Sequence, residues 1–194
     1  MLILLGILDF SLAMKDSMSV SSATRAGIRF GAANARVGGS TGFYDGTAAA
    51  VAKVLLAISA TGPQELWIYR ASSTGYPIFS GAATTNFATG CDYCQKYTWD
   101  AATRSWTRPN AGTTEGGQSG TNAWTYISQY ACQNTQTQSF GVYVKDNHDY
   151  VTGLIKPLAG SSVALTDRSV AKLEPQPSRA GAPCEPAAAA PATP

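Results

Sequence analysis

Residues 1–37 carry the longest helical pattern in the chain. They begin with an apolar run from Met1 to Leu8 and contain no proline before the pair Gly38-Gly39. Positions at steps of three, four or seven share one helix face, and these are Leu5, Leu8, Leu12, Ser19, Ala23, Ala26, Phe30 and Ala33. At 1.5 Å per residue such a helix is about 50–55 Å long, more than the width of a small domain. The pattern predicts a long first helix, ended by the glycine pair, that projects from its domain or belongs to a larger assembly.

The next segments predict a second helix and then several strands. TGFYDG (41–46) has the composition of a turn, and 47–59 is an alanine-rich stretch that Thr47 caps. Alternating or β-rich segments predict strands at 65–70, 95–100, 104–108, 140–145 and 163–174, with a short strand near 78–79 in a surface loop over 72–90. Residues 123–132 predict a short helix or turn, and 148–155 a connector. Helices followed by strands favour an α+β fold, with the long first helix and the second helix on one face of an antiparallel sheet.

Composition limits the classes of function. Only 13% of the residues are charged and the net charge is +2, which is too small to indicate binding to nucleic acid or to an anionic membrane surface. The chain has a single histidine, so acid–base and metal chemistry have few candidate groups. Proline and alanine dominate 175–194, which predicts a disordered tail after a helix at 1–37 and a domain at 38–174.

The first helix has features of both a membrane helix and an assembly helix. Asp9 interrupts the apolar run, so the chain does not by itself supply the roughly 20 apolar residues of a transmembrane span. It also lacks the basic start and the small-residue cleavage site of a signal peptide. Gly27 and Gly31 form a flat strip for close approach of another element, while Arg25 and Arg29 share a different face.

The four cysteines, at 91, 94, 132 and 184, predict disulfide bonding in an exported, loop-rich domain. We expect one bridge, from Cys91 or Cys94 to Cys132, and an unpaired Cys184. Two alternatives remain open. Cys91-x-x-Cys94 has the spacing of a redox-active pair, although no βαβ pattern surrounds it. Cys91, Cys94, Cys132 and His148 together have the ligand types of a zinc site, although their spacing matches no short zinc motif.

Aromatic residues form the other candidate site. They are Trp67, Tyr69, Tyr97, Trp99, Trp106, Trp124, Tyr126, Tyr130 and Tyr143. Such residues either fill a core between helices and sheet or form a platform for binding sugars or surfaces. We expect a core role at the strand positions, with Trp106 and Trp124 the more exposed. No nucleophile motif accompanies His148-Asp149, and we expect a structural role for this histidine.

Two short motifs in the first helix resemble the TadE family of pilus-assembly proteins. Gly6-Ile-Leu-Asp-Phe-Ser11 matches the end of the family's apolar helix, and Ala23-Thr-Arg-Ala-Gly-Ile-Arg-Phe-Gly-Ala32 follows at the family's distance. The segments 141–144, 148–154, 165–170 and 173–175, with the cysteines around Tyr97-Thr-Trp-Asp100, resemble the actinobacterial branch of this family. The resemblance touches about residues 5 to 175. In the family the apolar helix begins earlier, so we expect this chain to lack the N-terminal half of its helix.

The resemblance implies a non-enzymatic minor pilin or pseudopilin with a pilin-like α+β fold and no cofactor or metal. Its partners would be other pilins and, through the missing half of the helix, the cell membrane, with the domain outside the membrane in a single-pass protein. Residues expected in helix packing and assembly are Ala23, Arg25, Ala26, Gly27, Arg29, Phe30 and Ala33. On this view Gly27→Leu leaves the isolated domain folded and blocks co-assembly. The alternatives are an exported adhesion module that uses aromatic loops and, third, a CxxC thiol oxidoreductase.

Overall fold

The computed structural model of the chain describes residues 2–34, 39–56, 65–87, 90–108, 138–151 and 160–174. It contains a long helix, a second helix and a five-stranded antiparallel sheet, and therefore has the expected α+β architecture. The elements are α1 (Leu2–Ala33), α2 (Gly39–Leu55), β1 (Glu65–Arg70), β2 (Ile78–Phe79), β3 (Ala82–Ala83), β4 (Cys94–Asp100), β5 (Ser105–Thr107), β6 (Ser139–Asp149) and β7 (Ser162–Lys172).

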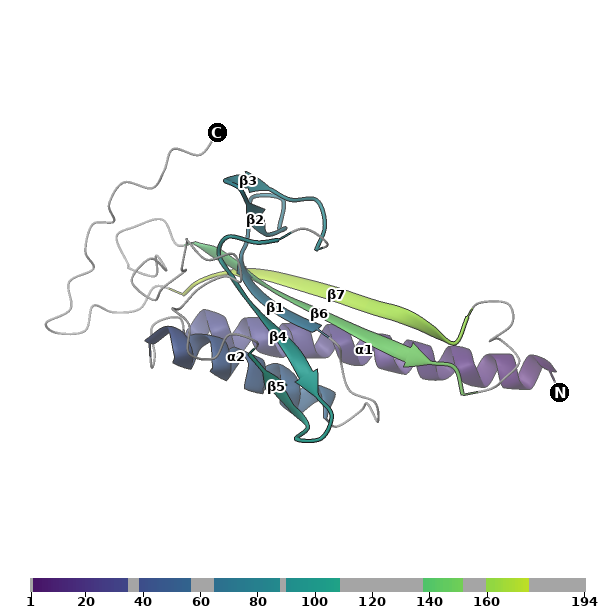
Figure 1. The fold of residues 1–194 in the computed structure, drawn as a ribbon. Helices are drawn as coiled ribbons and strands as arrows, with labels where there is room; N and C mark the ends of the chain where they lie inside the picture. Colours follow the sequence, from purple (N-terminus) through teal and green to yellow (C-terminus); the bar gives the residue numbers. More distant parts are fainter. Residues whose placement is uncertain are drawn as a thin grey trace, which may run out of the picture.

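The molecule has two main layers. The sheet has the strand order β5-β4-β1-β6-β7, and both helices pack on one of its faces (Figure 1). The small β2–β3 hairpin lies on the other side of the sheet, within the connection from β1 to β4. Alternation along the strands sends Leu66, Ile68 and Val142 into the core beneath the helices, where Leu66 and Ile68 are fully buried. We call this side of the sheet its inner face and the opposite side its outer face.

Glycines allow α1 to pack closely on α2 and on the sheet. A Cβ atom on Gly27 would lie 2.6 Å from Cγ2 of Val51 in α2 and 3.3 Å from Cγ1 of Val142 in β6. A Cβ atom on Gly31 would lie 2.6 Å from the ring of Phe140. The two distances of 2.6 Å are shorter than real Cβ contacts, so a larger residue at either position would force its neighbours to shift. The glycine strip predicted from the sequence is therefore used inside the domain.

The second helix begins earlier than predicted. The sequence placed a turn at 41–46 and a helix start at Thr47, whereas α2 begins at Gly39 and includes both segments. Phe43 and Tyr44 explain the difference, because both are fully buried and the Phe43 ring packs edge-on against Phe140, with centroids 5.5 Å apart. Burial of these two rings outweighs the weak helix propensity of the glycine-rich start.

Most strands lie where they were expected, and β1 matches its predicted range of 65–70. The clearest difference is β6, which continues through 148–149, where a connector was expected. The extra residues remain in the sheet because β7 pairs with them as far as Asp149↔Ser162, and because His148 faces α1. The predicted short helix or turn at 123–132, the end of the second helix at 57–59 and the tail at 175–194 lie outside the described residues.

Hydrogen bonds fasten the β6–β7 hairpin along almost the whole length of α1. The Val151 amide donates to Asp9 at 3.1 Å, Thr24 Oγ1 donates to Asp167 at 2.6 Å, and the Glu174 amide donates to the Ala32 carbonyl at 3.1 Å. Between the first two, Nδ1 of His148 lies 2.6 Å from Asp16. The contacts at positions 9, 16, 24 and 32 are seven or eight residues apart, so they connect α1 to the hairpin about once every two helical turns.

Candidate functional site

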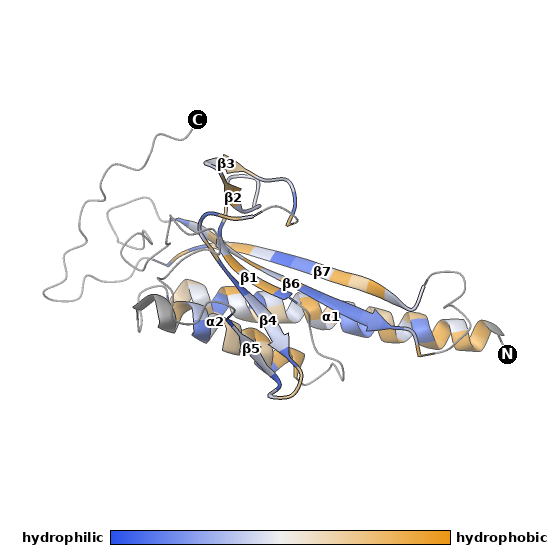
Figure 2. Cartoon of the chain, in the orientation of Figure 1, coloured by the Kyte–Doolittle hydropathy of each residue, from blue (hydrophilic) through white to orange (hydrophobic). Residues whose placement is uncertain are grey.

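The side of α1 that faces away from the sheet carries an exposed apolar stripe. Phe10 is 67% exposed and Met18 61%, and the stripe consists of Ile3, Ile7, Phe10, Met14 and Met18. These positions are separated by steps of three or four, which places them on one face. Figure 2 shows that apolar residues continue to the N-terminal end of α1, which extends past the ends of β6 and β7. No other described part of the chain covers this stripe.

The same face changes character toward the C-terminal end of α1. Arg25 lies seven residues after Met18, and Arg29 lies four further on, so both arginines continue the line of the stripe. Both side chains are exposed. A shallow groove of about 500 Å³ runs beside Phe10, Met14 and Met18. The side of α1 that faces away from the sheet is therefore apolar in its first half and cationic in its second half.

The residues predicted to mediate assembly divide between the two sides of α1. Ala23, Gly27 and Gly31 are buried against the rest of the chain, and Phe30 is half-buried against Gly46 of α2. Arg25, Arg29 and Ala33 are exposed, and Ala26 lies between these extremes. The packing argues against the prediction that Gly27→Leu would leave the domain folded, because a larger side chain at this position meets Val51 and Val142. The large apolar residues at 3–18 are the surface that sequence reasoning missed.

The cysteines pair differently from the expectation. Cys91 is joined to Cys94, with Cα atoms 5.8 Å apart, whereas a bridge from one of them to Cys132 was favoured. The two sulfur atoms meet because the short turn at 91–93 brings Cys91 back beside the first residue of β4. Both cysteines are almost fully buried in an aromatic cluster on the outer face, so the pair presents no accessible redox site. Cys132 and Cys184 lie outside the described residues.

His148 does not meet the cysteines. Cys94 pairs through Tyr69 with Gly141, seven residues before His148 on β6, which corresponds to about 23 Å along the strand. The proposed zinc set is therefore not assembled. In the described part of the chain, no three His, Cys, Asp or Glu side chains lie together as metal ligands. His148 instead contacts Asp16 near Asp146, whose pKa burial raises from 3.8 to about 6.

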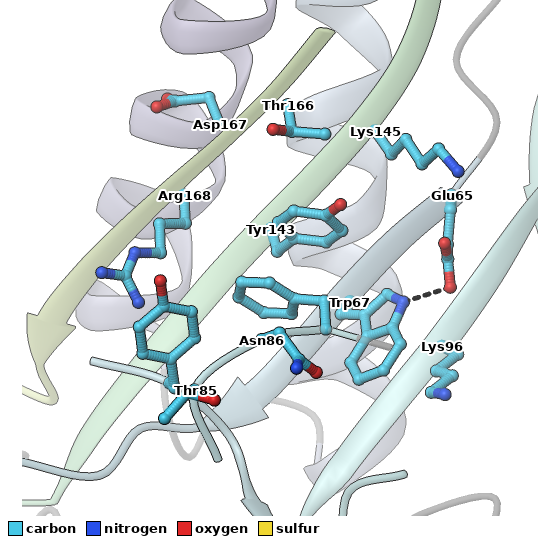
Figure 3. A pocket seen from close by; sticks show the side chains of 12 residues that line it. Glu65, Trp67, Thr85, Asn86, Lys96, Tyr143, Lys145, Thr166, Asp167 and Arg168 are labelled. Carbon is cyan, nitrogen blue, oxygen red and sulfur yellow. Dashed lines mark hydrogen bonds between the residues drawn. The ribbon is translucent and has the colours of Figure 1, made fainter. Parts of the chain in front are cut away.

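A pocket with a volume of about 840 Å³ lies on the outer face of the sheet (Figure 3). The register of four strands builds its floor, since Lys96 on β4, Trp67 on β1, Tyr143 on β6 and Arg168 on β7 are successive partners. This row, which we call the cationic–aromatic row, has a positive charge at each end and two rings between them. Its ends are three strand spacings, or about 14 Å, apart.

A second row of residues borders the pocket. Glu65 pairs with Lys145, which pairs with Thr166, and Glu65 accepts a hydrogen bond from Nε1 of Trp67. The connection from β1 to β4 closes the other side with Tyr76, Thr85, Asn86 and Phe87. The Phe87 ring stacks on Tyr143, with centroids 3.8 Å apart. The pocket thus has an aromatic base and a rim of charged, hydroxyl and amide groups.

Two of the cations are held on aromatic rings. Lys96 Nζ lies 3.6 Å from the centroid of the Trp67 ring, and the Arg168 guanidinium carbon lies 3.6 Å from the centroid of Tyr76. These are close cation–π contacts. Burial lowers the pKa of Lys96, and the nearby Glu65 carboxylate opposes that change. Burial also raises the pKa of the Tyr143 hydroxyl, so the phenol is a neutral hydrogen-bonding group at ordinary pH.

The aromatic residues have both of the roles considered from the sequence. Tyr97 belongs to the core under the helices, and its hydroxyl donates to Asp45 of α2 at 2.7 Å. Trp106 packs against the same core but is partly exposed, which agrees with the expectation that it is more exposed than the aromatic residues of the central strands. Trp67, Tyr69 and Tyr143 lie instead on the outer face, beneath the β1–β4 connection. Trp124, Tyr126 and Tyr130 are outside the described residues.

Two further findings bear on function. No helix among the described residues is both long and apolar enough to cross a membrane. Comparisons with protein-family models, with curated proteins and with solved structures gave no match.

Proposed function

We propose that this chain is a non-enzymatic component of a pilus or of its assembly machinery. It packs against other pilin-type helices through the side of α1 that faces away from the sheet. In this proposal the sheet and α2 form a domain outside the membrane, at the cell surface. The resemblance of the segments at 6–11 and 23–32 to TadE-like proteins supports the assignment. The arrangement of a long helix against an antiparallel sheet is compatible with it, although a fold alone does not define a function.

One observation carries the proposal, and it is the exposed apolar stripe of α1. Five large side chains on one helical face, from Ile3 to Met18, remain in contact with solvent, although the domain buries Asp9, Ser19 and Val20 on other sides of the same helix. The stripe extends over about 22 Å, the length of a helix–helix contact of four turns. Large contiguous apolar patches on a folded surface are characteristic of interaction sites. A second apolar helix supplies the matching shape.

The arginines give the contact a direction. Arg25 and Arg29 follow the stripe on the same face, so a helix that lies along α1 meets apolar residues first and positive charge second. A partner helix whose C-terminal end or acidic side chains reach this second region gains favourable electrostatic interactions. A partner with positive charge there is rejected. The face therefore selects both the register and the orientation of its partner.

The test replaces one residue in the stripe and follows assembly in cells. Phe10→Asp should leave the free domain folded, because the side chain is 67% exposed. It should abolish co-purification with other pilins, since a charge in an apolar helix contact has no partner there. The matched control is Ala102→Asp, which adds the same charge to an exposed turn at the end of the β4–β5 hairpin.

The readouts are the thermal unfolding temperature of the purified chain and its amount in sheared surface filaments and membrane complexes. Full assembly of the Phe10→Asp chain would overturn the proposal. So would equal loss of assembly in the Ala102→Asp chain, because the effect would then not be specific to α1.

A further inference from the structure

We propose that the pocket on the outer face of the sheet is a binding site for an anionic carbohydrate, meaning a sugar that carries carboxylate or phosphate groups. The site is on the opposite layer from α1. It is built from the side chains of the pocket alone and is independent of the function proposed for the helix.

The charge of the pocket favours an anion. Lys96, Lys145 and Arg168 line it, and among the described residues Glu65 is the one carboxylate whose position faces the same space. Asp167 also borders the pocket, but its carboxylate accepts a hydrogen bond from Thr24 on the inner face. The Glu65 carboxylate is itself engaged with the indole of Trp67. Three cationic side chains thus surround a concave surface whose facing carboxylate, Glu65, is already hydrogen-bonded to Trp67. The overall net charge of the chain is only +2.

Two of the three cations, Lys96 and Arg168, are held in position before any ligand arrives. Stacking of Lys96 on Trp67 and of Arg168 on Tyr76 restricts two long side chains that would otherwise be flexible. The two rings are anchored in turn, because Trp67 is only 1% exposed and Tyr76 packs against Phe87. Binding therefore loses less side-chain entropy than it does at a typical surface lysine or arginine. Such preorganisation distinguishes this pocket from a general positive surface.

The remaining groups favour a hydroxyl-rich ligand over a flat aromatic one. Tyr143 is only 9% exposed, and the Phe87 ring covers its face, so the base of the pocket offers little free ring surface for stacking. Thr85, Asn86 and Thr166 lie around the rim and can donate or accept hydrogen bonds. Sugars present hydroxyl groups of this kind around the edge of a ring whose C–H face is apolar. The volume of the pocket is within the usual range for small-ligand sites, about 300–1,000 Å³.

Calorimetric titration of the full chain at one fixed salt concentration tests the proposal. The ligands are trigalacturonic acid, which carries carboxylates, a phosphorylated maltotriose, which carries a phosphate, and neutral maltotriose. We expect saturable binding of one of the two anionic ligands, and which of them binds identifies the source of the negative charge. Maltotriose should not bind. Absence of binding by both anionic ligands, or equal binding of maltotriose, would overturn the proposal.

Charge-removing variants then locate the site. Arg168→Gln should weaken binding about tenfold or more, because a charge-assisted hydrogen bond is lost. The matched control, Arg104→Gln, removes the same charge from the exposed turn between β4 and β5 and should leave affinity unchanged. Lys145→Gln is the second variant in the pocket, in case Arg168→Gln lowers stability. Equal weakening by Arg104→Gln would show general electrostatic attraction and would overturn the assignment.

Discussion

Nδ1 of His148 lies 2.6 Å from Oδ2 of Asp16, and this contact joins the end of β6 to the first half of α1 across 132 residues of sequence. The imidazole is almost completely buried, and its Nε2 atom has no hydrogen-bond partner among the described residues. The contact holds the β6–β7 hairpin against α1 beyond the point where the other strands of the sheet have ended. It is one of the few connections that support the N-terminal half of the helix.

A double-mutant cycle should show that His148 and Asp16 stabilise the fold jointly. We expect a coupling energy of about 1–2 kcal/mol between Asp16→Asn and His148→Gln. Either substitution alone already removes this partly buried, charge-assisted contact, so the second one has no contact left to remove. Urea denaturation of the single and double variants measures it. Asp16→Asn combined with Arg108→Gln is the control pair, and its coupling should be near zero. A coupling near zero for the first pair would contradict a direct interaction.

Asp146 should make the stability of the protein depend on pH. Burial raises its pKa from 3.8 to about 6, although a hydrogen bond from the Asn147 amide acts to lower that pKa. Asp16 and Asp149 further raise the value, and His148 lowers it. The folded state therefore binds a proton more tightly than the unfolded state between these two pKa values. Asp146 thus costs stability at pH 7, and this cost disappears as the pH falls from about 6 to below 4.

Asp146→Asn should accordingly raise the free energy of unfolding by about 1 kcal/mol at pH 7–8, after allowance for solvent screening. The gain should shrink as the pH falls through 6 and vanish near pH 4. Chemical denaturation at a series of pH values measures this difference. A constant gain across the series would show that the carboxylate is not the cause.

Two glycines of α1 should respond in opposite ways to the same substitution. Gly27→Ala should lower the free energy of unfolding by about 1–2 kcal/mol, because overpacking against Val51 outweighs the gain in helix propensity. Gly6→Ala is the matched control, since a Cβ atom there meets nothing within 4 Å. It should stabilise the helix by up to about 1 kcal/mol. Thermal and urea unfolding compare the two variants, and an equal response would contradict the close packing at Gly27.

Peptide mapping should find the disulfide within one tryptic fragment. Cleavage after Arg70 and Lys96 releases residues 71–96, which contain Cys91 and Cys94 and no other cysteine. Without reduction, this fragment should be a single peptide that is two hydrogen atoms lighter than the reduced form. A fragment joined to the peptide that contains Cys132 would contradict the pairing. The variant Cys94→Ser should cost about 2 kcal/mol of stability on the chain-entropy model for so short a loop.

The sequence was sufficient for the parts of the fold that depend on local patterns. The strand at Glu65–Arg70 and the β4–β5 hairpin follow from β propensity and alternation, and α1 follows from its periodicity. The start of α2 was missed because turn-forming residues at 41–46 become helical once Phe43 and Tyr44 are buried. That burial is a tertiary effect, and it overrides propensity.

The candidate sites depend on contacts that are distant in sequence. Lys96, Trp67, Tyr143 and Arg168 become neighbours only through the register of four strands, which no local pattern determines. The packing partners of Gly27 could not be predicted for a similar reason. Spacing indicated a strip of small residues correctly, but only the position of α2 shows that the strip is occupied. The exposed apolar positions before Met18 were visible in the sequence as an apolar run, yet their exposure was not.

The series of contacts at positions 9, 16, 24 and 32 of α1 also determines how the molecule bears mechanical load. These bonds connect the helix to a hairpin that lies along it, over about 35 Å. A force along the helix axis pulls on all of them in shear, so they must yield together. A force that lifts the N-terminal end sideways acts on the Asp9 contact first and opens the rest one at a time. The same helix is therefore strong in the direction of its axis and weak across it.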